Sequence, residues 1–144
     1  MLTGEYKKFY HEIKATIETS RLYTDEIRNL AYGTDAGFYR LIPQIIIRAK
    51  NEAEVQKAVI LADKYNLPVT FRAAGTSLAG QAITDSILII AGKHWEYFDV
   101  LKNGEAIRMQ PGMVGSRVNK VLAPYGKKLG PDPASINSAM IGGI

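Results

Sequence analysis

The sequence predicts an α+β protein in which a parallel β-α-β core is followed by the start of a second, mixed or antiparallel β unit. Two short apolar runs, Gln44–Arg48 and Val69–Arg72, flank a segment of helical periodicity. Further along, Asn103-Gly104 separates two strand-like stretches. A helix between two strands favours parallel pairing, whereas an Asn-Gly pair favours a hairpin. The two signals together predict two units of different sheet type.

Residues 1–35 are expected to form an amino-terminal helical extension, ahead of a domain that occupies residues 36–144. Between Tyr6 and Ile17, apolar residues recur at helical spacing with lysine and glutamate between them, which is typical of an amphipathic helix. A second helix is expected after Thr24, whose hydroxyl can accept a hydrogen bond from an amide of the first turn. Gly33 is placed to end that helix.

The β-α-β core is the most clearly patterned segment. Asn51 with Glu54 has the form of a capping box that opens a helix, and Pro68 lies just beyond its end. The strand Val69–Arg72 then returns parallel to the first one, through a right-handed connection. The run Ile87–Ile90 is predicted to be another central strand. The inward face of the helix is expected to carry Val55, Ala58, Val59 and Ala62.

The second unit is expected to begin as a hairpin. Its strands are predicted at Tyr97–Val100 and Glu105–Gln110, on either side of the Asn-Gly pair. A helix is predicted over Val114–Ala123, with apolar residues on its inner side. The tail Leu129–Ile144 is rich in glycine, proline, serine and asparagine and has no periodicity.

Length and composition restrict the function classes. A chain of 144 residues suits one ordinary domain, and its formal net charge of +4 is dispersed, which suits an anionic ligand without indicating nucleic acid. The chain has no cysteine, so it has no disulfide, thiolate metal site or thiol nucleophile. The charged first residues lack the apolar centre of an export signal, and no apolar run reaches the ~20 residues of a membrane-spanning helix. We therefore expect a protein that is not transmembrane.

The loop Ala73–Gln81 follows a predicted strand and lies at its carboxyl end, where α/β sheets bind ligands. Gly75 and Gly80 allow positive φ, so successive amides can face inward as an anion nest, and Thr76 and Ser77 add hydroxyl donors. A phosphate or pyrophosphate would suit such a nest, although for the loop alone a plain strand-to-strand turn is the alternative. The P-loop and Rossmann fingerprints are excluded because neither spacing is present.

Two segments resemble one family of flavoproteins. Arg72–Gly80 reads Arg-Ala-Ala-Gly-Thr-Ser-Leu-Ala-Gly, which resembles the pyrophosphate loop of FAD-binding domains of the vanillyl-alcohol oxidase and p-cresol methylhydroxylase (PCMH) type. Gly130–Ser135, followed by Ile141-Gly142-Gly143, resembles the second flavin-contacting loop of that family. The chain departs from the pattern at Ala73-Ala74, where many relatives carry glycines, and this restricts the backbone slightly.

This resemblance implies a PCMH-type FAD-binding domain over residues 36–144, truncated at its carboxyl end, with FAD as the cofactor. The amides of residues 74–77 would hold the pyrophosphate, and the second loop would touch the flavin side of FAD or its ribityl chain. The residues expected to bind the cofactor are Ala73, Ala74, Gly75, Thr76, Ser77, Leu78, Gly80 and Gln81 in the first loop, and Pro131, Asp132, Ser135, Gly142 and Gly143 in the second.

Two further segments, Tyr32-Gly33-Thr34-Asp35 and the helix after Gln110-Pro111-Gly112, are similar to FAD-linked D-lactate, glycolate and D-2-hydroxyglutarate dehydrogenases. The resemblance implies that the full-length protein oxidises a small 2-hydroxy acid by hydride transfer to FAD. It also implies an iron-sulfur domain or subunit as electron acceptor, and a cytoplasmic location, with peripheral attachment to the inner membrane as a second option. No catalytic residue and no metal ligand is assigned, because the family places its base and substrate-binding cations in later segments.

Two alternatives remain open: a nucleotide- or anion-binding module without chemistry, and an aryl-alcohol or sugar oxidase of the same superfamily. The last residues, Ser138–Ile144, stop inside an apolar glycine-rich motif. We therefore expect a fragment of a longer chain, which alone would be inactive.

Overall fold

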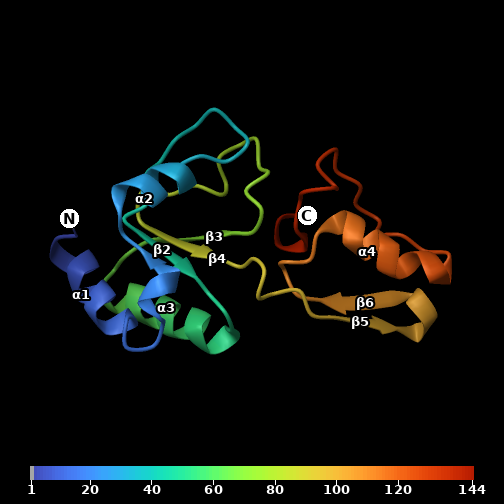
Figure 1. The fold of residues 1–144 in the computed structure, drawn as a ribbon, viewed down its shortest axis with the longest axis horizontal. Helices are drawn as coiled ribbons and strands as arrows, with labels where there is room; N and C mark the ends of the chain where they lie inside the picture. The colour runs from blue at the N-terminus through green and yellow to red at the C-terminus, as the bar shows by residue number, and fades with distance from the viewer. Residues whose placement is uncertain (1) are drawn as a thin grey trace.

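The computed structural model describes residues 2–144, which form two units joined end to end (Figure 1). The first unit is a four-stranded sheet with helices on both faces, and the second is a two-stranded hairpin covered by one α-helix. The chain enters the second unit once, after β4, and its carboxyl end returns to the boundary between the units (Figure 1). The helices are α1 (Gly4–Ile13), α2 (Glu26–Tyr32), α3 (Glu52–Lys64) and α4 (Gly115–Leu122).

The four-stranded sheet has the order β1-β2-β4-β3. Its strands are β1 (Leu22–Tyr23), β2 (Ile45–Arg48), β3 (Val69–Arg72) and β4 (Ile87–Ile90). Strand β4 pairs in parallel with both β2 and β3, so the predicted β-α-β core is present, with the third strand inserted at its centre. The antiparallel strand β1 was not predicted, because two residues are too few to show a period of two.

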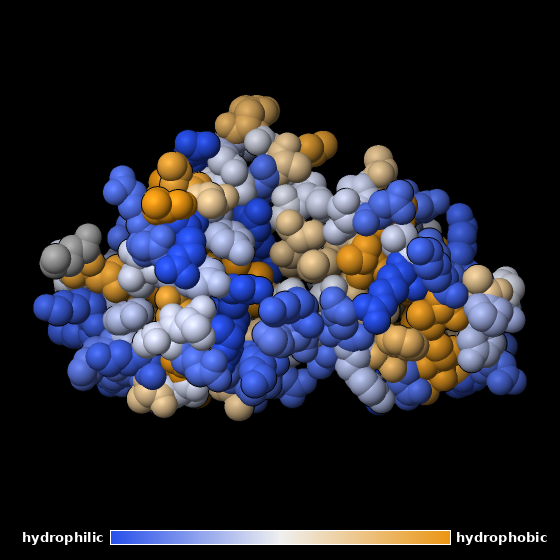
Figure 2. Space-filling model, viewed as in Figure 1, coloured by the Kyte–Doolittle hydropathy of each residue, from blue (hydrophilic) through white to orange (hydrophobic). Residues whose placement is uncertain are grey.

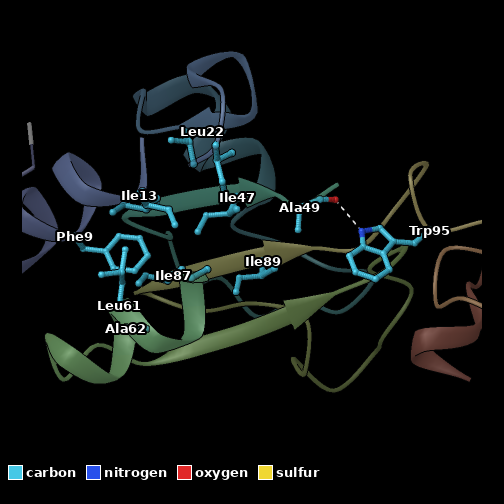
Figure 3. Close-up of a cluster of buried hydrophobic side chains, with 13 residues drawn as sticks. Phe9, Ile13, Leu22, Ile47, Ala49, Leu61, Ala62, Ile87, Ile89 and Trp95 are labelled. Atoms are coloured by element: carbon cyan, nitrogen blue, oxygen red, sulfur yellow. Dashed lines mark hydrogen bonds between the residues drawn. The ribbon is translucent and has the colours of Figure 1, made fainter. Parts of the chain in front are cut away.

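The central strands β2 and β4 are apolar throughout because both of their faces are covered. Ile45, Ile47, Ile87 and Ile89 belong to the cluster that α1 and α3 cover, and Figure 3 labels the last three of them. Ile46 and Leu88 belong to a second cluster, against which Tyr32 of α2 packs. The first helix and the residues after it contribute Phe9, Ile13, Ile17 and Leu22 to this core. The division of the chain at residue 35 stays a prediction of the sequence.

The first helical predictions need two corrections. Helix α1 ends at Ile13 rather than Ile17, since the next residues form turns that still bury Ile17. The cap of α2 is Asp25, not Thr24: its carboxylate accepts a hydrogen bond from the Arg28 amide at 3.0 Å. A carboxylate is the better acceptor at this position, because it also complements the positive end of the helix dipole.

Helix α3 departs from its prediction at two residues. Asn51 caps the helix by accepting a hydrogen bond from the Glu54 amide at 3.0 Å, but the Glu54 carboxylate does not return to Asn51. It is buried and accepts two hydrogen bonds from Arg21, at 2.6 and 2.7 Å, and one from the Lys50 amide at 2.8 Å. Val59, predicted to face inward, is exposed, and Leu61 takes its place in the core.

The second unit confirms the predicted hairpin and helix. Strands β5 (Phe98–Leu101) and β6 (Ala106–Met109) pair antiparallel. Lys102, Asn103 and Gly104 all adopt positive φ in the turn between them. Helix α4 packs on one face of this hairpin, with Met113, Val118 and Leu122 at the centre of a separate core. The parallel first sheet and the antiparallel second sheet confirm the predicted α+β class.

Trp95, in the segment between β4 and β5, forms hydrogen bonds with residues of both units. Its ring is buried in the first core, and its indole N–H donates to the Ala49 carbonyl at 2.8 Å (Figure 3). Its own carbonyl accepts a hydrogen bond from Gly112 of the second unit, also at 2.8 Å. A Cβ on Gly112 would lie 2.2 Å from the Gly92 carbonyl oxygen, so only glycine allows this close crossing.

Candidate cofactor-binding site

A cleft of about 780 Å³ lies between the two units and is lined by both of the loops singled out in the sequence. In the space-filling view, this part of the molecule is hollowed between the first unit and the second (Figure 2). All the predicted contact residues line the cleft except Gly80, which lies in the first loop beside Tyr39. The lining residues that were predicted are Ala73, Ala74, Gly75, Thr76, Ser77, Leu78, Gln81, Pro131, Asp132, Ser135, Gly142 and Gly143.

The first loop offers a row of free backbone donors. Within residues 2–144, none of the N–H groups of residues 74–77 donates a hydrogen bond to another protein atom, and these residues are only partly exposed. Gly75 turns the chain with a φ of +74°. Successive amides without protein acceptors in a turn of this kind form a concavity that is suited to an anion. The Ser77 hydroxyl is used within the loop, where it donates to Gln81 and accepts from the Ala79 amide.

Arg72 lies directly behind this row and fixes its path. One nitrogen of its guanidinium donates to the carbonyls of Tyr32, Thr34 and Ala82, at 3.2, 2.7 and 3.4 Å. Burial lowers the pKa of Arg72, an effect opposed by Tyr32 and Asp35, yet an arginine remains protonated at neutral pH. A positive charge therefore lies behind the free amides, which adds to their attraction for an anion.

A second set of residues supports the loop from outside. The Ala36 amide donates to the Ser77 carbonyl at 3.1 Å, and a Cβ on Gly37 would lie 2.8 Å from the Leu78 carbonyl oxygen. The segment from 34 to 39 therefore packs along the back of the loop. The sequence predicts no role in shaping the cleft for this segment or for Arg72, because their contacts with the loop are long-range.

The second loop is held by main-chain contacts. The carbonyls of Ile136 and Ala139 accept hydrogen bonds from the Ser116 and Gly115 amides at the start of α4, at 2.9 and 3.0 Å. The Gly142 amide donates to the Pro111 carbonyl at 2.9 Å. Asp132 is exposed and forms a salt bridge with Lys128 at 3.4 Å. This loop thus presents small and polar residues opposite the free amides of the first.

Metal sites and membrane spans were looked for in the part of the chain that the structure describes. Residues 2–144 contain no group of three or more His, Cys, Asp or Glu side chains that could hold a metal ion. In the same range, no helix is long and apolar enough to cross a membrane.

The geometry defines a class of site: a cleft between two units, lined on one side by the loop with free amides and Arg72 and on the other by small and polar residues. The negative charge of a pyrophosphate suits the free amides and the arginine. The donor set therefore fits FAD.

The family model described as FAD binding domain matches residues 43–144. The chain belongs to this family, and FAD is the cofactor of the domain. Among curated relatives, glycolate oxidase subunit GlcD of Escherichia coli K12 is 30% identical over 125 residues, covering 85% of this chain and 25% of that protein. D-2-hydroxyglutarate dehydrogenase of the same organism is 28% identical over 133 residues, covering 90% of this chain and 13% of that protein.

Solved structures agree on the fold. Alkyldihydroxyacetonephosphate synthase matches with a TM-score of 0.79 at 23% identity, over 96% of this chain and 29% of that one. p-Cresol methylhydroxylase matches with a TM-score of 0.69 at 13% identity, over 88% of this chain and 26% of that one. The chain therefore has the PCMH-type FAD-binding fold, as the sequence predicted. It spans a quarter or less of the two curated relatives named above.

Proposed function

We propose that the two loops hold FAD between them, with the pyrophosphate on the free amides of residues 74–77. This proposal rests on a row of backbone amides without protein acceptors, in residues that line the cleft together with the positively charged Arg72. Leu78, Gly80 and Gln81 complete the first wall. Pro131, Asp132, Ser135, Gly142 and Gly143 lie toward the flavin ring and its ribityl chain. Bound FAD would accept a hydride, while these residues of the chain bind and orient it.

The substrate of the whole protein is proposed to be a 2-hydroxy acid of the D-lactate, glycolate or D-2-hydroxyglutarate type. Support comes from the two relatives above, whose names are glycolate oxidase subunit and D-2-hydroxyglutarate dehydrogenase. The protein would then be a FAD-dependent 2-hydroxyacid dehydrogenase or oxidase. Its electron acceptor would be an iron-sulfur domain or subunit, and it would work in the cytoplasm or at the periphery of the inner membrane.

The test uses the whole protein that contains this sequence, purified with its FAD and kept free of oxygen. Each hydroxy acid is added in turn, together with its L enantiomer where one exists. Loss of the yellow flavin absorbance with one or more of the D-lactate, glycolate and D-2-hydroxyglutarate set is the expected result. Bleaching by aryl alcohols or sugars and not by any hydroxy acid would contradict the proposed substrate class, and a preparation without FAD would contradict the cofactor role.

A further inference from the structure

Large apolar side chains that face solvent gather on one side of the first unit, on a surface that we call the α2 patch. Figure 2 shows orange side chains along the upper side of this unit, over α2 and above it. Its three most exposed members are Phe38 at 87%, Ile27 at 81% and Leu78 at 74%. The complete patch consists of Ile27, Leu30, Phe38, Tyr39, Leu41, Ile42 and Leu78.

Helix α2 is oriented with its apolar side outward. Ile27 and Leu30 lie three positions apart, on one side of the helix, and both are exposed. The side chain of Asn29 faces the protein instead: it is buried, and its amide donates to the Gln44 carbonyl at 3.2 Å. A surface helix usually buries its apolar side and exposes its polar side. The reversed orientation of α2 is that of a helix at an interface.

The other members extend the patch from α2 toward the first loop. The Ile42 side chain packs on Gly33, at the end of α2, where a Cβ would lie 2.6 Å from Ile42 Cδ1. The Phe38 and Tyr39 rings have their centroids 4.4 Å apart, and Tyr39 lies against Gly80 of the first loop. The segment that carries these residues lies above α2 and beside the first loop (Figure 1). These contacts make the patch one surface, whereas scattered apolar residues would need no explanation.

The size of the patch matches that of a protein interface. The exposed parts of its side chains add up to about four fully exposed large residues, on the order of 700 Å² at roughly 150–200 Å² each. A soluble monomer rarely exposes an apolar patch larger than a few hundred Å². A standard interface buries about 800 Å² on each partner. The α2 patch is therefore large enough to form the centre of such an interface.

Two charges of opposite sign accompany the patch. Glu26 lies in the first turn of α2, and Arg40 directly follows Tyr39. Both are exposed, and within residues 2–144 neither forms a salt bridge. In a two-fold symmetric dimer the same surface meets itself, so a residue of one copy lies opposite a different residue of the other. An acidic and a basic residue in one apolar patch are therefore complementary to a second copy of that patch.

We propose that the α2 patch is the interface of a homodimer, in which Glu26 of each copy pairs with Arg40 of the other across an apolar centre. The occupant of the patch is thus a second copy of this chain. Leu78 belongs both to the patch and to the lining of the cofactor cleft, so the second copy would lie at the rim of that cleft. The proposal does not depend on which ligand the cleft holds.

Sedimentation equilibrium of the 144-residue chain over a range of concentrations tests the proposal, and a reversible monomer–dimer equilibrium is the expected result. Ile27→Asp should raise the dissociation constant of the dimer by at least roughly 10-fold, the effect of losing one buried isoleucine side chain. An aspartate in the first turn complements the helix dipole, so α2 should still form. The matched control is Ile60→Asp, on the outer side of α3, where the isoleucine is 63% exposed and lies outside the patch. This control should leave the dissociation constant unchanged.

An exchange of charges tests the pairing itself. Glu26→Arg and Arg40→Glu should each weaken the dimer, because each places like charges opposite one another, and the double variant should restore it. Loss of folding could not give such a restoration. If Ile27→Asp does not fold, Phe38→Ser removes the most exposed ring of the patch and should weaken the dimer in its place.

A chain that stays monomeric at every concentration would overturn the proposal, and so would a dimer that Ile27→Asp leaves unchanged. A double variant that is weaker than both single variants would refute the pairing of Glu26 with Arg40. Binding of a monomeric chain to vesicles of phosphatidylglycerol and phosphatidylcholine, lost in Ile27→Asp, would make lipid the occupant of the patch instead. The whole protein that contains this sequence should also be a dimer, and a monomeric whole protein would contradict the proposal.

Discussion

Gly75→Ala is the most informative single change in the first loop. Gly75 has a φ of +74°, and a Cβ at this position would lie 2.3 Å from a terminal nitrogen of Arg72 and 2.5 Å from its guanidinium carbon. The guanidinium cannot swing aside freely, because one of its nitrogens is bound to three carbonyls. The methyl group must therefore displace the loop itself, along with the amides that it presents.

The expected magnitude has two parts. The left-handed backbone costs an alanine about 1–2 kcal/mol, which lowers the stability of the fold. Displacement of one amide from the pyrophosphate removes a hydrogen bond to a charged group, worth about 1.5–3 kcal/mol. At 1.4 kcal/mol per factor of ten, FAD should bind roughly 10- to 150-fold more weakly.

Calorimetric titration with FAD measures this loss, and Gly126→Ala is the matched control. Gly126 has a similar φ of +66°, but a Cβ there would meet nothing within 4 Å, and it does not line the cleft. The control should lose stability and keep its FAD affinity. If Gly75→Ala bound FAD normally, or if Gly126→Ala weakened FAD equally, the steric argument for the first loop would be refuted.

Three other predictions concern the scaffold. Arg21 lowers the pKa of Glu54, so this group stabilises the fold above about pH 4.3, its unfolded value, and the benefit is lost as the pH falls toward the folded value. Glu54→Gln should therefore cost about 3 kcal/mol in the free energy of unfolding by urea at pH 7. The cost should fall as the pH is lowered below about 4.3, and a cost that does not change with pH would count against the ion pair. Asp25→Ala should lower the free energy of unfolding by about 1 kcal/mol in the same assay, because it removes the cap of α2. Thr24→Ala should change it by no more than about 0.5 kcal/mol. A larger loss for Thr24→Ala than for Asp25→Ala would contradict the assignment of the cap. Trp95→Phe leaves the buried Ala49 carbonyl without its donor and should lower the free energy of unfolding by about 1–3 kcal/mol. An unchanged urea midpoint would argue against the role of Trp95 in joining the two units.

The sequence predicted the elements whose signals are local. Ile45–Arg48 and Ile87–Ile90 are continuous apolar runs because both faces of β2 and β4 are covered, and Asn103-Gly104 marks its own turn. Strand order was not predictable, because nothing in the residues of β4 says that it inserts between β2 and β3. The partner of Glu54 was missed for the same reason, since Arg21 lies 33 positions away.

In the candidate site, too, local features could be predicted from the sequence and long-range contacts could not. The first loop is recognisable because its glycines and hydroxyl residues occur within one short segment. The structure brings residues of both loops to one cleft. The contribution of Arg72 and the support from Gly37 depend on contacts across about 40 positions. The sequence predicts that Phe71 belongs to a strand. Its exposure could not be predicted, because that depends on β3 lying at the edge of the sheet in the folded protein.

The central claim is that FAD spans both loops with its pyrophosphate on the free amides of the first. A crystal structure of the chain with FAD bound tests it most directly. We expect phosphate oxygens within hydrogen-bonding distance of the amides of residues 74–77, and the flavin ring near Pro131–Ser135. A pyrophosphate bound away from residues 74–77 would contradict it.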